Sequence, residues 1–163
     1  MWLLVSNQAG SVDPLPSEGF LLAQSKIAAE TIEAYLKTNY SFGYGADPIT
    51  LCIDTRSEPL LQLYTSSGYT CGAFITAYNP CGQAQSPEAN EAAHARLREK
   101  LNTLSPKVIE GAGADPSGKW PKEKSFFALG INLETAKSLG ICYKQNAIVW
   151  VGADAVPELI LLR

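Results

Sequence analysis

The order of apolar runs and helix signals between residues 72 and 151 constrains the fold of this chain most. Residues 72–79 are apolar and rich in aromatic and β-branched side chains, which favour a strand, and Pro80 ends this run. A helix is predicted next, because Ser86 is a good N-cap residue and Pro87 suits the first helical position. This part of the chain therefore begins with a strand followed by a helix.

Residues 107–151 are predicted to form three further strands and a second helix. Residues 107–110 predict a short strand and residues 125–131 a strongly apolar one. Asn132 is expected to cap a second helix, and residues 146–151 predict a further strand. The order β-α-β-β-α-β is that of the split βαβ arrangement. The sequence therefore predicts an α+β fold with a ferredoxin-like βαββαβ core over about residues 72–151 and a largely antiparallel sheet.

The segments outside this core are predicted to be additions to it. Residues 1–20 are rich in Ser, Gly, Pro and Asp and predict an irregular lead-in. Apolar residues at helical spacing predict an N-terminal helix over residues 21–36, and two glycines favour a loop over residues 39–48. Short β-like runs at residues 49–53 and 158–162 would supply extra strands, the second of which pairs with the last core strand.

Length and composition predict one globular domain spanning residues 1–163, with 46% apolar and 18% charged residues. The net charge of −3 and the lack of a basic stripe argue against nucleic acid and membrane surfaces as partners. The apolar start Met1–Val5 is short, and the first basic residue is Lys26, so no signal peptide is predicted. We therefore expect a cytoplasmic protein.

The cysteines and the single histidine predict no metal site and no cofactor. No two cysteines form a C-x-x-C pair, and one histidine gives poor support for zinc. Cys52, Cys71, Cys81 and Cys142 are therefore expected to be free and mostly buried. His94 lies among charged residues of the first core helix and is expected at the surface.

Three polar clusters lie where the predicted core strands begin or end, at residues 76–80, 119–125 and 143–146. In a βαββαβ arrangement the first strand ends, and the third begins, at the same edge of the sheet. The loop after the second strand and the turn after the second helix also reach that edge. Asn90 joins them, because it extends the apolar stripe of the first core helix backwards by one turn. The clusters are therefore predicted to form one site.

Glu123 is the candidate catalytic residue at this edge. It lies between Trp120 and Phe126, where partial desolvation would raise its pKa into a range useful for general acid or base catalysis. The alternative is a structural carboxylate that forms an ion pair with one of the neighbouring lysines, Lys119, Lys122 and Lys124.

The other candidates are groups that could bind a ligand without changing charge. Side-chain amides both donate and accept hydrogen bonds, which suits either a polar ligand or the locking of loops. The aromatic rings of Tyr78 and Trp120 could stack on a planar ligand or cover the core. The predicted ligand-binding residues are Asn79, Asn90, Trp120, Gln145 and Asn146.

Three segments of the sequence together resemble a known family. They run from Phe74 to Pro80, from Gly111 to Phe126 and from Gln145 to Ile148. They are similar to an uncharacterised bacterial family, domain of unknown function 3293, and the likeness extends from near Ile32 to the C terminus. The resemblance implies a small, soluble, single-domain bacterial protein, and it implies no activity, substrate or cofactor.

The sequence thus favours a module that binds a small polar molecule or a peptide end at one edge of its sheet. An enzyme, a hydrolase or group transferase using Glu123 as general acid or base, is an alternative. A protein-interaction module is the other alternative, because ferredoxin-like sheets expose edge strands through which a homodimer could form.

Overall fold

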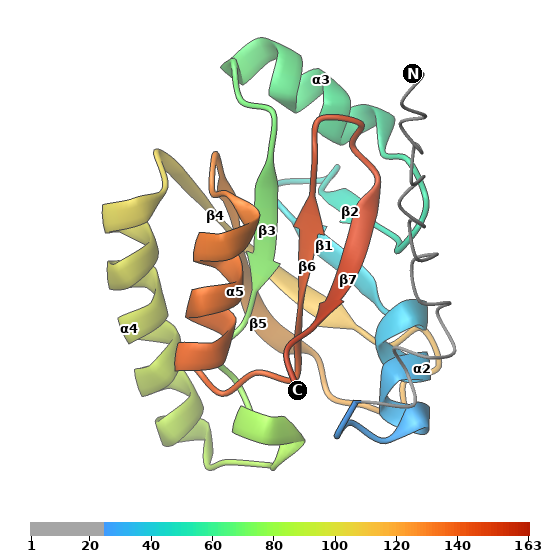
Figure 1. Cartoon of the computed structure of the whole chain (residues 1–163), viewed down its shortest axis with the longest axis vertical. Helices are drawn as coiled ribbons and strands as arrows, with labels where there is room; N and C mark the ends of the chain where they lie inside the picture. Colours follow the sequence, from blue (N-terminus) through green and yellow to red (C-terminus); the bar gives the residue numbers. More distant parts are fainter. Residues whose placement is uncertain (1–24) are drawn as a thin grey trace, which may run out of the picture.

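The computed structural model describes residues 25–163 as an α+β protein (Figure 1). The predicted irregular lead-in and the start of the predicted N-terminal helix lie outside the described residues. The α-helices are α2 (Ala29–Lys37), α3 (Glu58–Ser67), α4 (Pro87–Leu104) and α5 (Leu133–Cys142), with a 3-10 turn η1 (Pro80–Gly82). The strands are β1 (Asn39–Phe42), β2 (Ile49–Leu51), β3 (Gly72–Ile75), β4 (Lys107–Ala114), β5 (Glu123–Leu129), β6 (Ala147–Val151) and β7 (Pro157–Leu161).

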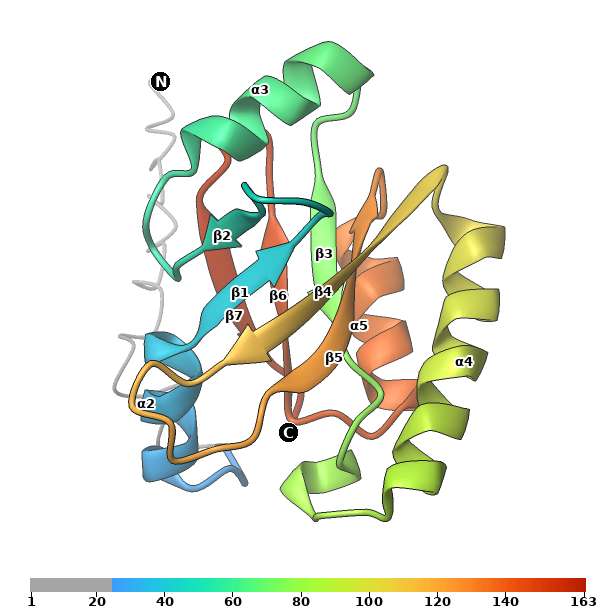
Figure 2. The ribbon, with the colours of Figure 1, turned by 180° about the vertical axis from the view of Figure 1, so that it is seen from behind.

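The strands form one sheet of seven in the order β2-β1-β4-β5-β3-β6-β7. Every neighbouring pair is antiparallel, which confirms the predicted α+β class and the antiparallel sheet. The two most apolar strands, β3 and β5, are neighbours in the interior of the sheet. The helices α4 and α5 lie side by side over one face (Figure 1). Figure 2, seen from the other side, shows β1 and β2 in front, with α3 across one end.

The sheet separates two hydrophobic cores, because successive side chains of a strand point to opposite faces. Phe74 packs with Leu60 and Tyr64 of α3 in the first core. Its neighbour Ile75 packs with Leu97 and other residues of α4 and α5 in the second. Both cores therefore depend on the alternation of side chains between the two faces of the sheet along β3 and β5.

The helix starts follow the predicted local signals. The hydroxyl of Ser86 accepts a hydrogen bond from the backbone N–H of Ala89 at 3.2 Å, and Asn132 accepts one from Thr135 at 2.8 Å. Gly68 ends α3 in the left-handed conformation, with φ of 76°. These boundaries were predictable because each cap involves residues close in sequence.

The prediction of a loop over residues 39–48 was wrong for residues 39–42, which form strand β1, and is confirmed for residues 43–48. Along β1, buried Tyr40 and Phe42 alternate with the less buried Asn39 and Ser41. The partner of this short strand is the second half of β4, from Gly111 to Ala114. A four-residue strand is specified by such a distant partner rather than by its own propensity.

The predicted surface position of His94 was also wrong, since only 8% of this residue is exposed. It lies three residues before Leu97 on the inner face of α4, and its ring stacks on Phe126 with centroids 4.1 Å apart. Burial lowers the pKa of His94 below its ordinary value; nearby Lys124 and Arg98 act in the same direction, against Glu91.

The cysteines are free, as predicted, but they are not mostly buried. Cys52 and Cys142 are exposed, and Cys71 and Cys81 are half-buried. Helix α5 ends at Cys142 on its exposed side, and Cys52 lies in a turn that follows edge strand β2. No helix in residues 25–163 is both long and apolar enough to cross a membrane.

Candidate ligand-binding cavity

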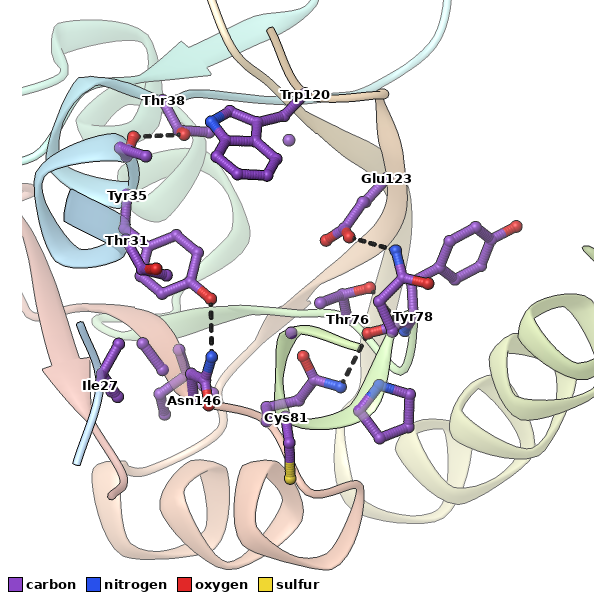
Figure 3. A pocket seen from close by; sticks show the side chains of 18 of the residues that line it. Ile27, Thr31, Tyr35, Thr38, Thr76, Tyr78, Cys81, Trp120, Glu123 and Asn146 are labelled. Carbon is purple, nitrogen blue, oxygen red and sulfur yellow. Dashed lines mark hydrogen bonds between the residues drawn. The ribbon is translucent and has the colours of Figure 1, made fainter. Parts of the chain in front are cut away.

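A cavity of about 1040 Å³ lies at one end of the sheet, and all three predicted polar clusters line it. Asn79 comes from the segment after β3, Glu123 from the start of β5, and Asn146 from the turn before β6. Figure 3 shows the Glu123 and Asn146 side chains directed into the same space. The predicted convergence of these segments is therefore present in the structure.

Asn79 and Asn90 form a reciprocal pair next to the cavity. The Asn79 backbone N–H donates to Asn90 Oδ1 at 3.0 Å, and Asn90 Nδ2 donates to Asn79 Oδ1 at 3.0 Å. Asn79 has a left-handed backbone, with φ of 48°, which asparagine adopts more readily than most residues. Asn90 is buried and does not line the cavity, so its contacts position Asn79.

Asn79 in turn holds the carboxylate of Glu123. Its Nδ2 donates to Glu123 Oε1 at 2.7 Å, and Figure 3 shows this bond at the cavity wall. Burial raises the pKa of Glu123 above its ordinary value, and the Asn79 hydrogen bond lowers it in part. The predicted desolvation of Glu123 is thus present, although an amide moderates its effect.

The alternative prediction for Glu123, an ion pair with a neighbouring lysine, is not observed. The ion pairs found among residues 25–163 do not include Glu123, and Lys124 instead contacts Glu91 with a separation of 2.6 Å. Glu123 is therefore a carboxylate at a cavity surface without a cationic partner in the described part of the chain.

Gln145 and Asn146 lock the segments that frame the cavity. Gln145 Nε2 donates to the carbonyl oxygens of Tyr78 and Tyr143, at 3.1 and 3.2 Å, so its amide joins the end of β3 to the turn after α5. Asn146 Nδ2 donates to the hydroxyl of Tyr35 at 3.1 Å, and its Oδ1 accepts from Arg163 at 3.3 Å. Both amides thus have a structural role, and both residues also line the cavity.

The two aromatic candidates differ in position. Trp120 lines the cavity and is 61% exposed, so its ring stands at the opening rather than over a core. The Tyr78 ring points away from the cavity in Figure 3, and its hydroxyl donates to Glu91. Burial and the carboxylate of Glu91 raise the pKa of Tyr78 to about 12. Tyr78 is nevertheless among the residues that line the cavity, so its stacking on a ligand stays a prediction.

One wall of the cavity was missed in the sequence. Helix α2 contributes Thr31 and Tyr35, which lie on one side of the helix because they are four residues apart, and Thr38, the residue that follows the helix, also lines the cavity. The hydroxyl of Tyr40 also reaches this wall and donates to the Tyr35 carbonyl at 2.7 Å. The spacing was visible in the sequence, but the position of α2 against the other segments depends on the tertiary fold.

We expect the Glu123→Gln variant to be more stable than the wild type at pH 7. The folded-state pKa of Glu123 is raised, so its contribution to stability is full below the unfolded pKa and is lost as pH rises through the folded value. Glutamine carries no charge and can still accept the hydrogen bond of Asn79. Thermal unfolding from pH 3 to pH 8 should show the two proteins alike in acid and separated at neutral pH.

The matched control is Glu30→Gln, which removes one carboxylate from the exposed side of α2. The thermal stability of this variant should differ little from that of the wild type at every pH from 3 to 8. A Glu123→Gln protein that is less stable than the wild type at pH 7 would contradict the assignment of Glu123 as a desolvated carboxylate.

The fold and cavity define a small α+β protein with a pocket of mixed polar and apolar lining at one end of an antiparallel sheet. Residues 75–148 match the family model described as "Protein of unknown function (DUF3293)", which confirms the resemblance predicted from the sequence. No curated protein and no solved structure gives a significant match to the chain. The matched segment contains every predicted site residue, whereas the α2 wall and Arg163 lie outside it.

Proposed function

We propose that this protein binds a small polar molecule, or the end of a peptide, in the cavity between α2 and the end of the sheet. The observation that carries the proposal is the Glu123 carboxylate, held by Asn79 and directed into a cavity of about 1040 Å³. Ligand pockets have volumes on the order of 300–1,000 Å³ and combine apolar walls with a few fixed polar groups.

The walls of this cavity have that mixed character. Apolar surface comes from Ile27, Phe74 and Leu159, and polar groups come from Glu123 and Asn146. The hydrogen bonds of Asn79 and Asn146 hold these groups in place without a ligand. A pre-formed site of this kind loses little conformational freedom on binding, which favours affinity.

Within this proposal the predicted site residues have different roles. Glu123, Asn146 and Trp120 would contact the ligand directly. Asn79 orients Glu123, and Asn90 orients Asn79 through their paired hydrogen bonds. Gln145 holds the two adjoining segments together, which its two carbonyl contacts support.

A thermal-shift screen of the purified chain against cell metabolites tests the proposal. We expect at least one compound to raise the unfolding temperature, because a ligand at 100 times its Kd stabilises the folded state by about 2.7 kcal/mol. For a chain of this size that corresponds to roughly 5–10 °C. The absence of any stabilising compound would count against a binding module.

Variants of α2 show whether a stabilising compound occupies this cavity. Thr31→Trp places a large ring into the cavity and should abolish the shift. Glu33→Trp places the same ring on the exposed side of the helix and should leave the shift intact. Circular dichroism shows whether each variant folds, and Trp120→Ala at the cavity opening provides a second, milder loss of contact. If the compound raises the unfolding temperature of all three variants equally, it binds outside this cavity.

Catalysis by Glu123 is the second candidate function, and the raised pKa of its carboxyl group supports it. An enzyme of this kind, a hydrolase or group transferase, would use Glu123 as general acid or base. Incubation of each stabilising compound with the wild type, followed by mass spectrometry, should then show a product that Glu123→Gln does not form. A compound that is recovered unchanged indicates binding alone.

We also propose that this is a bacterial, cytoplasmic, single-domain protein with a ferredoxin-like core. The adjacent order β4-β5-β3-β6, with α4 and α5 on one face, supports such a core. Dimerisation through an edge strand stays a prediction for β2 or β7, the two outer strands. Sedimentation of the wild type, and of a variant with a charge added on β7, tests it.

A further inference from the structure

One oxygen of the Glu123 carboxylate is available to a ligand. Oε1 accepts from Asn79, whereas Oε2 receives no hydrogen bond from the residues described. Figure 3 shows the second oxygen facing the open space between Glu123, Tyr35 and Trp120. Its position calls for a hydrogen-bond donor, and a carboxylate binds a charged donor more strongly than a neutral one.

Aromatic rings surround the same space. Tyr35, Tyr40 and Trp120 all line the cavity, and Figure 3 shows the Tyr35 and Trp120 rings across the space from the carboxylate. The negative face of an aromatic ring attracts a cation, and this attraction is stronger where water is excluded. A carboxylate and aromatic rings together therefore complement a positive charge.

The donors in the cavity suit an organic cation better than a metal ion. Calcium and magnesium require several oxygen ligands, often more than one carboxylate. Residues 25–163 contain no group of three or more His, Cys, Asp or Glu side chains placed to hold a metal. An ammonium group needs only one carboxylate when aromatic rings surround it, and the apolar walls from Ile27 and Leu159 would accommodate the rest of the molecule.

We propose that the cavity binds an organic ammonium group attached to a short apolar chain, with an N–H of the ammonium donating to Glu123 Oε2. This inference rests on the proposed function and names the chemistry of its ligand. The ammonium could belong to a free amine or to the amino terminus of a peptide, since both present the same group.

The cations that also line the cavity define the competing possibility. Lys26, Lys144 and Arg163 are among the lining residues, and Arg163 contacts Asn146 rather than Glu123. A ligand carboxylate would be drawn to these groups. A test of the ammonium proposal must therefore compare positive, neutral and negative probes of the same size.

Isothermal titration calorimetry with pentylamine, pentan-1-ol and pentanoate at pH 7.5 makes this comparison. We expect pentylamine to bind at least tenfold more tightly than pentan-1-ol, and pentanoate to bind no better than the alcohol. Glu123→Gln should lose at least tenfold in affinity for pentylamine and keep its affinity for pentan-1-ol, whereas the control Glu30→Gln should change neither. Tighter binding of pentanoate would overturn the proposal, as would equal affinity of wild type and Glu123→Gln for pentylamine.

A peptide pair distinguishes the two sources of the ammonium. If the source is a peptide terminus, the tripeptide Leu-Ala-Ala amide binds and its N-acetyl form does not. Binding of pentylamine without the tripeptide supports a free amine instead. Equal binding of the free and acetylated peptides would overturn the ammonium assignment for peptides and amines alike, because the charge would then contribute nothing.

The outcomes separate this inference from the proposed function. If metabolites stabilise the wild type and Thr31→Trp abolishes their effect, the cavity binds ligands whether or not they carry an ammonium group. Failure of pentylamine under those conditions overturns only the ammonium inference. If neither the metabolites nor the probes bind, both proposals fail.

Discussion

The Gly111→Val variant is expected to lose about 3 kcal/mol of folding free energy, the upper end of the usual cost of overpacking. A Cβ atom at Gly111 would lie 2.5 Å from the backbone oxygen of Ser41 and 2.9 Å from atoms of Phe42 and Phe74. The nearest of these atoms is backbone and cannot rotate away. Strand β1 would have to move from β4, breaking the pairing between Phe42 and Gly111.

The same strand supplies a matched control, Gly113→Ala. A Cβ atom there has Thr38 at 3.5 Å as its nearest neighbour and Tyr40 at 3.8 Å, which are ordinary contacts. Its stability should stay within about 0.5 kcal/mol of the wild type. Urea unfolding followed by circular dichroism measures both variants. Wild-type stability in Gly111→Val would show that β1 does not lie against β4 as described.

The Phe127→Ala variant is expected to lose about 3–5 kcal/mol, typical of the removal of a buried aromatic ring. Phe127 is 0% exposed, and its ring stacks on that of Phe42 with centroids 4.1 Å apart and an angle of 9° between the planes. It also covers Gly72, where an added Cβ atom would lie 2.5 Å from its ring. The ring thus links β1, β3 and β5 within the first core.

Thermal unfolding should show a fall in the midpoint of roughly 10 °C for Phe127→Ala. Tyr44→Ala removes an aromatic ring that is 77% exposed and should change the midpoint little. Phe42→Ala and the double variant complete a mutant cycle, in which the stacked pair should show an interaction of about 0.5–1.5 kcal/mol. Additive losses would indicate that the two rings do not pack together.

Both variants also affect the cavity, because its walls are attached to the elements that they disturb. Tyr40 of β1 and Glu123 of β5 line the cavity, and β4 pairs with both strands. The position of Glu123 opposite the tyrosines therefore depends on the packing of the first core. Loss of ligand binding in a destabilised variant must be compared with its loss of folded protein.

Much of the candidate site could be predicted because strand direction follows from connectivity. The chain leaves β3 near Asn79 and enters β5 at Glu123, and antiparallel pairing of these strands brings the two residues together. The contribution of α2 was not predictable in this way. No strand pairing fixes its place, and the contact of Tyr35 with Asn146 joins residues 111 positions apart.

The same distinction holds for the rest of the fold. The sequence alone determined the helix starts at Ser86 and Asn132, because each cap is a hydrogen bond to a residue three positions away. Only the tertiary structure decided that residues 39–42 form a strand and that His94 is buried, because a distant strand and a packed sheet supply their neighbours. Local hydrogen bonds can be read from adjacent residues, whereas burial and strand pairing depend on partners that folding brings together.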